Sequence, residues 1–312
     1  MVRTTLLLGL LMVGATAPAA DGTVAEGFAW LENQCFDGRG NLFFSDSTHG
    51  EVWRLFEGGE NRYHMELVQS DFQAVMGLAV DEARDEVLAV VVRREGRWLA
   101  RNYLVAFRAE LPSIYRIIAS LPSSGNGLVV HDRFAYISSA RSFLPEDGVV
   151  YRVDIERGSV DVFAEKLTYA NGLALDVAKQ HLYVGEWATG AIQVFDLATA
   201  RRVRTHHLLK PRDAEWLDDM VVDSERGWLY GTDFAKGRVV AVPLTGEAAG
   251  PVEVAAGLKN PTSVAFGRGT GFRGCSLYVT EGGGLTVHDA DRRLVEVPHV
   301  RCGDRGGACA AR

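Results

Sequence analysis

The chain has 312 residues, of which 47% are hydrophobic and 23% are charged, and its formal net charge is −7. This length and composition allow a large buried core. The acidic excess argues against nucleic acid as the main partner, because phosphate binding needs a basic face.

The first twenty residues have the pattern of a secretory signal peptide. A basic start at Arg3 precedes the apolar run 6–13, and small residues suited to cleavage follow at 15–20. The run is shorter than the ~20 apolar residues that span a bilayer, and no later segment is long and apolar enough. We predict a signal peptide over residues 1–20, a single domain over residues 21–312, and a secreted or periplasmic protein without stable membrane insertion. A buried N-terminal strand or helix is the alternative.

The four cysteines are expected to form disulfides if the protein is exported. They are Cys35, Cys275, Cys302 and Cys309, which allow three pairings. A cross-link from Cys35 to a C-terminal cysteine would close a long loop and so restrict the unfolded chain most. No Cys-x-x-Cys pair is present, which argues against a structural zinc site.

Short apolar runs separated by Gly, Asp, Asn and Ser recur along the chain and align as a repeat. The clearest copy contains Asn171-Gly-Leu-Ala-Leu-Asp176, His181-Leu-Tyr-Val-Gly-Glu186 and Ala191-Ile-Gln-Val-Phe-Asp196. Six copies start at residues 26, 76, 126, 171, 218 and 262. A period of about 40–50 residues, with three visible strands and room for a fourth, is typical of propeller blades. The predicted fold is therefore an all-β, six-bladed β-propeller with four-stranded antiparallel blades around a central channel.

The alignment places one residue of each copy just before the predicted channel-lining strand. These residues are Glu26, Met76, Asn126, Asn171, Asp218 and Thr262. Four of them, Glu26, Asn126, Asn171 and Asp218, are carboxylate or amide oxygen donors, which suit a hard cation. Ca²⁺ fits this donor set best, and Mn²⁺ or Zn²⁺ is the alternative. Each residue taken singly is explained by a turn or a strand cap, but four at equivalent positions favour a metal site.

Five segments resemble the senescence marker protein/gluconolactonase family, which is related to diisopropyl fluorophosphatases and paraoxonases. They are Glu26-Gly-Phe-Ala-Trp30, Asn171-Gly-Leu-Ala-Leu175, Leu182-Tyr-Val-Gly-Glu186, Asp218-Asp-Met-Val-Val-Asp223 and Pro261-Thr-Ser-Val-Ala-Phe-Gly267. The resemblance implies a calcium-dependent hydrolase that acts on a small-molecule lactone or ester. It also implies the metal ligands Glu26, Asn126, Asn171 and Asp218, with Asp218 as general base or nucleophile.

Two departures from the family pattern bear on the substrate. Sugar lactonases of the family carry Arg-x-Asn-Asp-Gly in the third blade, whereas this chain has Ser124-Gly-Asn-Gly127, so a sugar-acid lactone is not favoured. In the fifth blade a second carboxylate, Asp219, follows Asp218 and is a candidate supporting group.

The alternative function is a non-hydrolytic propeller, either a binding protein or a strictosidine-synthase-like pocket without the metal ligands. The oligomeric state stays open. Trp30 and Trp53 are expected to pack within the blades rather than to form a stacking platform.

Overall fold

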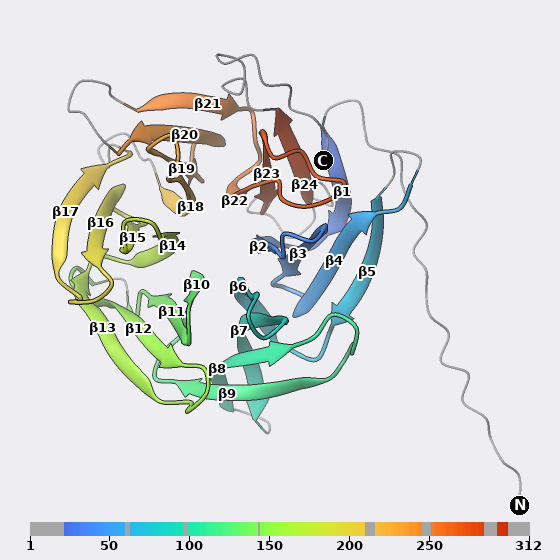
Figure 1. Cartoon of the computed structure of the whole chain (residues 1–312), viewed down its shortest axis with the longest axis horizontal. Helices are drawn as coiled ribbons and strands as arrows, with labels where there is room; N and C mark the ends of the chain where they lie inside the picture. Colours follow the sequence, from blue (N-terminus) through green and yellow to red (C-terminus); the bar gives the residue numbers. More distant parts are fainter. Residues whose placement is uncertain are drawn as a thin grey trace, which may run out of the picture.

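The computed structural model describes residues 22–59, 63–95, 99–142, 144–209, 216–244, 251–283 and 292–298. Within these ranges the chain forms strands and no helix. The strands make six four-stranded antiparallel sheets arranged as a ring around a central channel (Figure 1). The predicted six-bladed β-propeller is therefore confirmed.

The blades follow one another along the chain, and each begins with its innermost strand. Blade one contains β2 (Leu31–Phe36), β3 (Asn41–Asp46), β4 (Glu51–Glu57) and β5 (Tyr63–Gln69). Blade two contains β6 (Ala74–Asp81), β7 (Glu86–Glu95), β8 (Leu99–Phe107) and β9 (Tyr115–Leu121). Blade three contains β10 (Leu128–His131), β11 (Phe134–Ser139), β12 (Gly148–Asp154) and β13 (Val160–Leu167).

The second half of the ring repeats this order, with one change at its end. Blade four contains β14 (Ala170–Asp176), β15 (His181–Glu186), β16 (Ala191–Asp196) and β17 (Arg202–His207). Blade five contains β18 (Leu217–Asp223), β19 (Trp228–Asp233), β20 (Arg238–Pro243) and β21 (Val252–Ala256). Blade six contains β22 (Pro261–Phe266), β23 (Ser276–Glu281) and β24 (Arg292–Pro298), and its fourth, outermost strand is β1 (Thr23–Phe28).

The pairing of β1 with β24 closes the ring. Ala25 lies opposite Leu294, and Glu26 lies opposite Arg293. The first and last strands that the structure describes thus share one sheet, and the edge that β24 would otherwise expose is covered. Blade one consequently starts at β2, and not at the segment that contains Glu26.

Apolar side chains fill the space between neighbouring blades. One cluster joins Leu88 and Leu104 of blade two to Ile137 and Tyr151 of blade three, all of them buried. Interdigitation of this kind between sheet faces provides most of the apolar burial that stabilises a β-sheet protein. At the ring closure, Phe28 packs edge-on against the Trp53 ring with centroids 6.0 Å apart, which confirms Trp53 as a packing residue.

Carboxylates at the ends of second strands hold the loops that enter the innermost strands. They are Asp46, Glu186, Asp233 and Glu281. Asp233 Oδ1 accepts the backbone N–H of Trp216 at 3.2 Å, and Glu186 Oε1 accepts that of Thr168 at 3.0 Å. These bonds satisfy buried backbone donors and fix the chain just before it reaches the channel.

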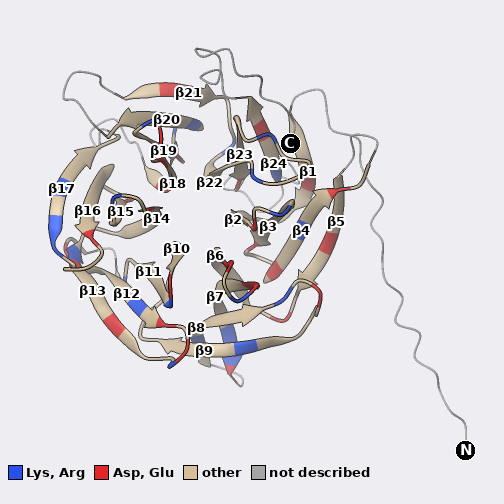
Figure 2. Ribbon diagram, viewed as in Figure 1, with Lys and Arg blue, Asp and Glu red and all other residues tan. Residues whose placement is uncertain are grey.

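Charged residues lie mainly on the outermost strands and the loops, where water solvates them (Figure 2). In the part of the chain that the structure describes, no helix is long and apolar enough to cross a membrane. The predicted signal peptide, Cys302 and Cys309 lie outside the described residues.

Cys35 is a free thiol, so the expected cross-link from Cys35 to the C-terminal region is wrong. The physical reason is its place on β2, where it lines the central channel. Burial, and next the charge of Asp37, raise the pKa of this thiol.

Candidate metal centre

Three of the four predicted ligands meet at one end of the channel. Asn171 and Asp218 are the second residues of β14 and β18, and Asn126 lies two residues before β10. Asn171 and Asp218 are buried, and Asn171 Nδ2 donates a hydrogen bond of 2.8 Å to Asp218 Oδ1. The repeat therefore brings these residues to the same end of neighbouring channel-lining strands.

The structure does not bring Glu26 to this place. Glu26 is exposed on β1, the outermost strand of blade six. Glu32, the second residue of β2, occupies the equivalent position of blade one, and Asn126 Nδ2 donates to Glu32 Oε1 at 3.3 Å. The prediction of Glu26 as a channel residue is wrong because closure by β1 shifts the start of blade one by one strand.

The spacing between strands could have identified Glu32. Asn171 and Asp218 each precede the first residue of the second strand of their blade, at 181 and 228, by 10 residues. Glu32 precedes the first residue of β3, at 41, by 9 residues, whereas Glu26 precedes it by 15. Glu26 is followed by a glycine, as Asn126 and Asn171 are in blades three and four. Because of this similarity the sequence alignment placed Glu26, and not Glu32, at the equivalent position of blade one.

The innermost strands are irregular where the site residues lie. The pairing register shifts between Ala170 and Leu173 in blade four and between Leu217 and Met220 in blade five. Such bulges re-aim side chains toward a site. In blade four the glycine is needed for close approach, because a Cβ on Gly172 would lie 2.6 Å from the Asp218 carbonyl oxygen. Asn171-Gly172 thus forms a close contact between adjacent blades.

The centre concentrates negative charge without a compensating cation. Burial, and next the charges of Glu32 and Asp219, raise the pKa of Asp218 well above its usual range. Burial also raises the pKa of Glu32, and it raises the pKa of Asp219 to about 6. Among the described residues, no Lys, Arg or His side chain forms an ion pair with these three carboxyl groups. An uncompensated buried acidic cluster is costly unless a cation neutralises it.

One buried oxygen supports the fit of a cation directly. Asn171 Oδ1 is buried and has no hydrogen-bond partner, while the nitrogen of the same amide is held by Asp218. Buried polar atoms are nearly always satisfied, and a missing ion is one accepted cause of an exception. With Glu32, Asn126 and Asp218, the centre offers only carboxylate and amide oxygens, the donors that Ca²⁺ prefers. These residues therefore fit a calcium ion.

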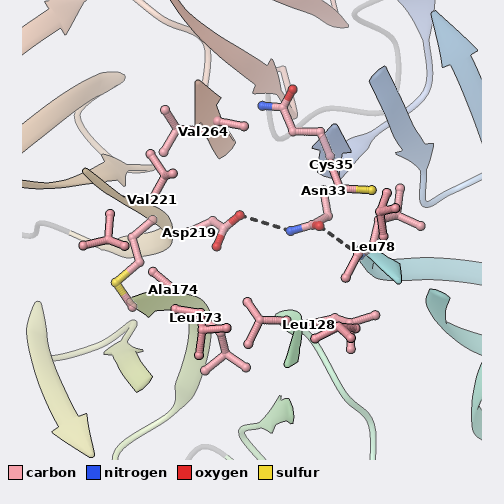
Figure 3. Close-up of a pocket in the computed structure, with 18 of the residues that line it drawn as sticks. Asn33, Cys35, Leu78, Leu128, Leu173, Ala174, Asp219, Val221 and Val264 are labelled. Carbon is pink, nitrogen blue, oxygen red and sulfur yellow. Dashed lines mark hydrogen bonds between the residues drawn. The ribbon is translucent and has the colours of Figure 1, made fainter. Parts of the chain in front are cut away.

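Hydrogen bonds cross the channel beneath the centre, and this network is here called the polar floor. Asp219 Oδ2 accepts hydrogen bonds from Ser263 Oγ at 2.6 Å and from Asn33 Nδ2 at 3.1 Å. Asn33 Oδ1 in turn accepts the backbone N–H of Leu78 at 2.9 Å, and Figure 3 shows these two bonds of Asn33. A cavity of about 320 Å³ borders this floor and is lined mainly by apolar residues of all six innermost strands. The lining of this cavity contains none of the four residues of the centre.

A second acidic cluster lies at the end of β3. Ligand atoms of Asp46, His49 and Glu51 lie within 4.8 Å of one another. Both oxygens of Asp46 are already engaged, Oδ2 by the backbone N–H of Ala29 at 2.8 Å and Oδ1 by that of Trp30 at 3.2 Å. This cluster fixes the loop before β2 and is not the candidate metal centre.

The fold and the site define a six-bladed propeller with an oxygen-donor centre at one end of its channel. The model of the family described as "SMP-30/Gluconolactonase/LRE-like region" matches residues 24–282, and the chain belongs to this family. A comparison with curated protein sequences gave no significant match.

Several solved structures share the fold. A luciferin-regenerating enzyme is 15% identical with a TM-score of 0.67, and the match covers 92% of this chain and 96% of that one. A gluconolactonase from Xanthomonas campestris is 17% identical with a TM-score of 0.63, covering 88% of each chain. Regucalcin from Agrobacterium tumefaciens, described as a calcium-binding protein, is 15% identical with a TM-score of 0.63, covering 92% of this chain and 97% of that one.

Proposed function

We propose that this protein is an exported, calcium-dependent hydrolase of lactones or related esters. The observation that carries the proposal is the group of buried Asn171 and Asp218 with half-buried Glu32 and Asn126, with its excess negative charge and the unpartnered Asn171 Oδ1. Membership of the gluconolactonase-containing family supports a lactonase-type reaction. The calcium-binding protein among the structural neighbours supports the choice of ion.

The four residues would hold the ion through their side-chain oxygens. A bound Ca²⁺ would supply Lewis-acid polarisation of the ester carbonyl and stabilise the oxyanion that develops on it. Asp218 would act on the substrate as general base toward water, or as nucleophile. The Asn171 amide holds Oδ1 of Asp218, and within the described residues Oδ2 accepts no hydrogen bond, so this oxygen is available for the reaction.

The neighbouring residues orient the reacting groups. Trp30 Nε1 donates to Glu32 Oε2 at 2.6 Å, which holds this carboxylate toward Asn126. The bonds of Asp219 to Asn33 and Ser263 cross the channel beneath the centre. A substrate would therefore approach the centre from the mouth, at the end where the innermost strands begin.

The test is hydrolysis of a panel of lactones and aryl esters by the wild type and by Asp218→Asn, each with Ca²⁺ and with a chelator. We expect Asp218→Asn to lose at least about 100-fold in kcat, because general-base catalysis contributes about 10²–10⁴-fold. Glu26→Gln, at an exposed position away from the centre, serves as the control and should keep full activity. Undiminished hydrolysis by Asp218→Asn, or by the wild type in chelator, would contradict the proposal.

Export is proposed from the signal-peptide pattern of residues 1–20. Its measurement is the N-terminal sequence of the protein recovered from the native host. A mature terminus close to residue 20, on protein from outside the cytoplasm, is expected. An intact Met1 on cytoplasmic protein would refute export.

A further inference from the structure

Five aromatic side chains form an unbroken row next to the metal centre. In order they are Tyr169, Trp187, Trp216, Phe234 and Trp30, here called the aromatic row. The centroids of successive rings are 5.1, 4.6, 6.3 and 6.1 Å apart. The Trp187 and Trp216 rings are stacked, with an angle of 29° between their planes. The row runs from blade four through blade five to the entry of blade one.

The repeat places the aromatic row at the mouth. Tyr169, Trp216 and Trp30 lie two residues before Asn171, Asp218 and Glu32, respectively. Trp187 and Phe234 directly follow the second strands β15 and β19, which are antiparallel to the innermost strands and so end at the same side. Phe234 is buried, whereas the other four rings are only partly buried and keep accessible surface.

One hydrogen bond ties the row to the ligands, because Trp30 Nε1 donates to Glu32 Oε2 at 2.6 Å. The chain connects the row to the ligands as well, since Tyr169 and Trp216 lie two residues before Asn171 and Asp218. Rings of the aromatic row therefore lie beside the atoms that would hold the ion and the reacting carbonyl.

Local features make room for this arrangement. In blade six the residue after the second strand is Gly282, where blades four and five have Trp187 and Phe234. A Cβ on Gly282 would lie 3.0 Å from Cζ2 of Trp30, so the glycine lets this ring lie over blade six and reach Phe234 in blade five. Trp30 thus packs against Phe234 of blade five and lies beside Gly282 of blade six at the mouth.

Tyr169 adopts a left-handed backbone conformation with φ of 56°. For a bulky residue this conformation is strained, and such strain gathers at functional sites. Trp30 and Trp216, at the equivalent positions of blades one and five, do not adopt it. Construction of a blade therefore does not require the strain at Tyr169.

The opposite part of the mouth is polar. Ser123 Oγ lies 2.8 Å from both Ser139 Oγ and the hydroxyl of Tyr151, in blade three and the loop that enters it. The residue after the second strand is Ser47 in blade one and Ala140 in blade three, so neither position carries a ring. At these two described positions the aromatic row is therefore not continued.

We propose that the aromatic row binds the planar, apolar part of the substrate, so that the ester or lactone cleaved at the centre carries an aromatic ring. This inference rests on the proposed hydrolase function. Rings stack favourably on aromatic side chains, whereas a polyhydroxylated sugar lactone would leave hydroxyl groups without partners against the row. The substrate class is an aryl ester or a benzo-fused lactone.

The kinetic test compares 3-isochromanone with δ-valerolactone, which has the same six-membered lactone ring and also an alkyl leaving group, but no fused benzene. We expect the wild type to prefer 3-isochromanone at least tenfold in kcat/KM. Trp216→Leu should raise KM for 3-isochromanone about tenfold more than it raises KM for δ-valerolactone, with little change in the ratio of the two kcat values. Trp216→Phe should restore most of the preference, and Trp53→Phe, a control at the ring closure, should not alter it. Equal kinetics on the two lactones in the wild type would overturn the inference.

A binding measurement separates this inference from the hydrolase function. Titration of the wild type with phenylacetate, in Ca²⁺, should change tryptophan fluorescence in a saturable way, whereas acetate should not. Saturable binding of phenylacetate that is lost in Trp216→Leu, without hydrolysis of any substrate, would support the aromatic row and refute the hydrolase. Hydrolysis of both lactones at equal rates, with phenylacetate binding no better than acetate, would refute the aromatic row and leave the hydrolase standing.

Discussion

Replacing Asp219 with asparagine should stabilise the metal-free protein at neutral pH, and the gain should disappear in acid. Burial, the largest cause, raises the pKa of Asp219 to about 6 from an ordinary value of 3.8. The folded state therefore favours the protonated carboxyl group, and ionisation at higher pH opposes folding.

The magnitude follows from linkage between protonation and folding. Between pH 3.8 and about 6 the folded chain binds more protons than the unfolded chain. The free energy of unfolding therefore falls as the pH rises across this range and levels off above it. A shift of roughly 2 units at about 1.4 kcal/mol per unit gives at most about 3 kcal/mol. Since the Asp219 side chain is only partly buried by surface area, a gain of about 1–3 kcal/mol is expected at pH 8. At pH 4 the gain should be below about 1 kcal/mol.

Asparagine keeps the shape and one acceptor oxygen, but it loses the hydrogen bond that the carboxylate accepts from the backbone N–H of Met220, which places the gain toward the lower end of the expected range. That oxygen can still accept the hydrogen bonds from Asn33 Nδ2 and Ser263 Oγ. The assay is urea unfolding of the wild type and Asp219→Asn in chelator at pH 4, 6 and 8.

Asp85→Asn is the control. Asp85 is half exposed, and its hydrogen bond from Arg39 lowers its pKa, so its removal should give no gain at pH 8. Loss of stability in Asp219→Asn at pH 8, or an equal gain at pH 4 and pH 8, would refute the reasoning.

Two further predictions concern the assignment of Glu32 and the glycine contacts between blades. At a Ca²⁺ concentration 100 times Kd, ion binding should stabilise the wild type by about 3 kcal/mol; Glu32→Gln should abolish most of the corresponding shift in Tm, whereas Glu26→Gln should keep it. If Glu26→Gln abolished the shift in Tm and Glu32→Gln kept it, Glu26 and not Glu32 would be the metal ligand. Gly172→Ala should destabilise the protein by about 1–3 kcal/mol, because the added Cβ would overlap the Asp218 carbonyl oxygen. Gly274→Ala, where the nearest atom lies at 3.6 Å, should stay within about 0.5 kcal/mol by urea unfolding, and equal effects of the two changes would contradict the close-approach argument.

Local sequence predicted most of the architecture. Each blade is built from antiparallel strands joined by short turns, so its apolar runs recur at a regular interval that can be counted. The same regularity predicted that Asn126, Asn171 and Asp218 occupy equivalent positions, and the structure brings them together at one end of the channel. The repeat predicts these equivalent positions because every blade packs against its neighbours in the same way.

The sequence by itself therefore determined the six-fold repeat, the fold class and three of the four residues of the candidate centre. Only the tertiary structure decided which glutamate completes it, since the pairing of β1 with β24 joins residues about 270 positions apart. That pairing makes Glu26 an outer-strand residue and moves Glu32 to the channel. The aromatic row was not predicted, although three of its rings precede site residues by two positions, because its members come from different blades and each is typical of a packing residue in its own segment. The contact of Trp30 with Phe234 depends in addition on closure of the ring, which brings blade one beside the later blades and leaves no pattern in the local sequence.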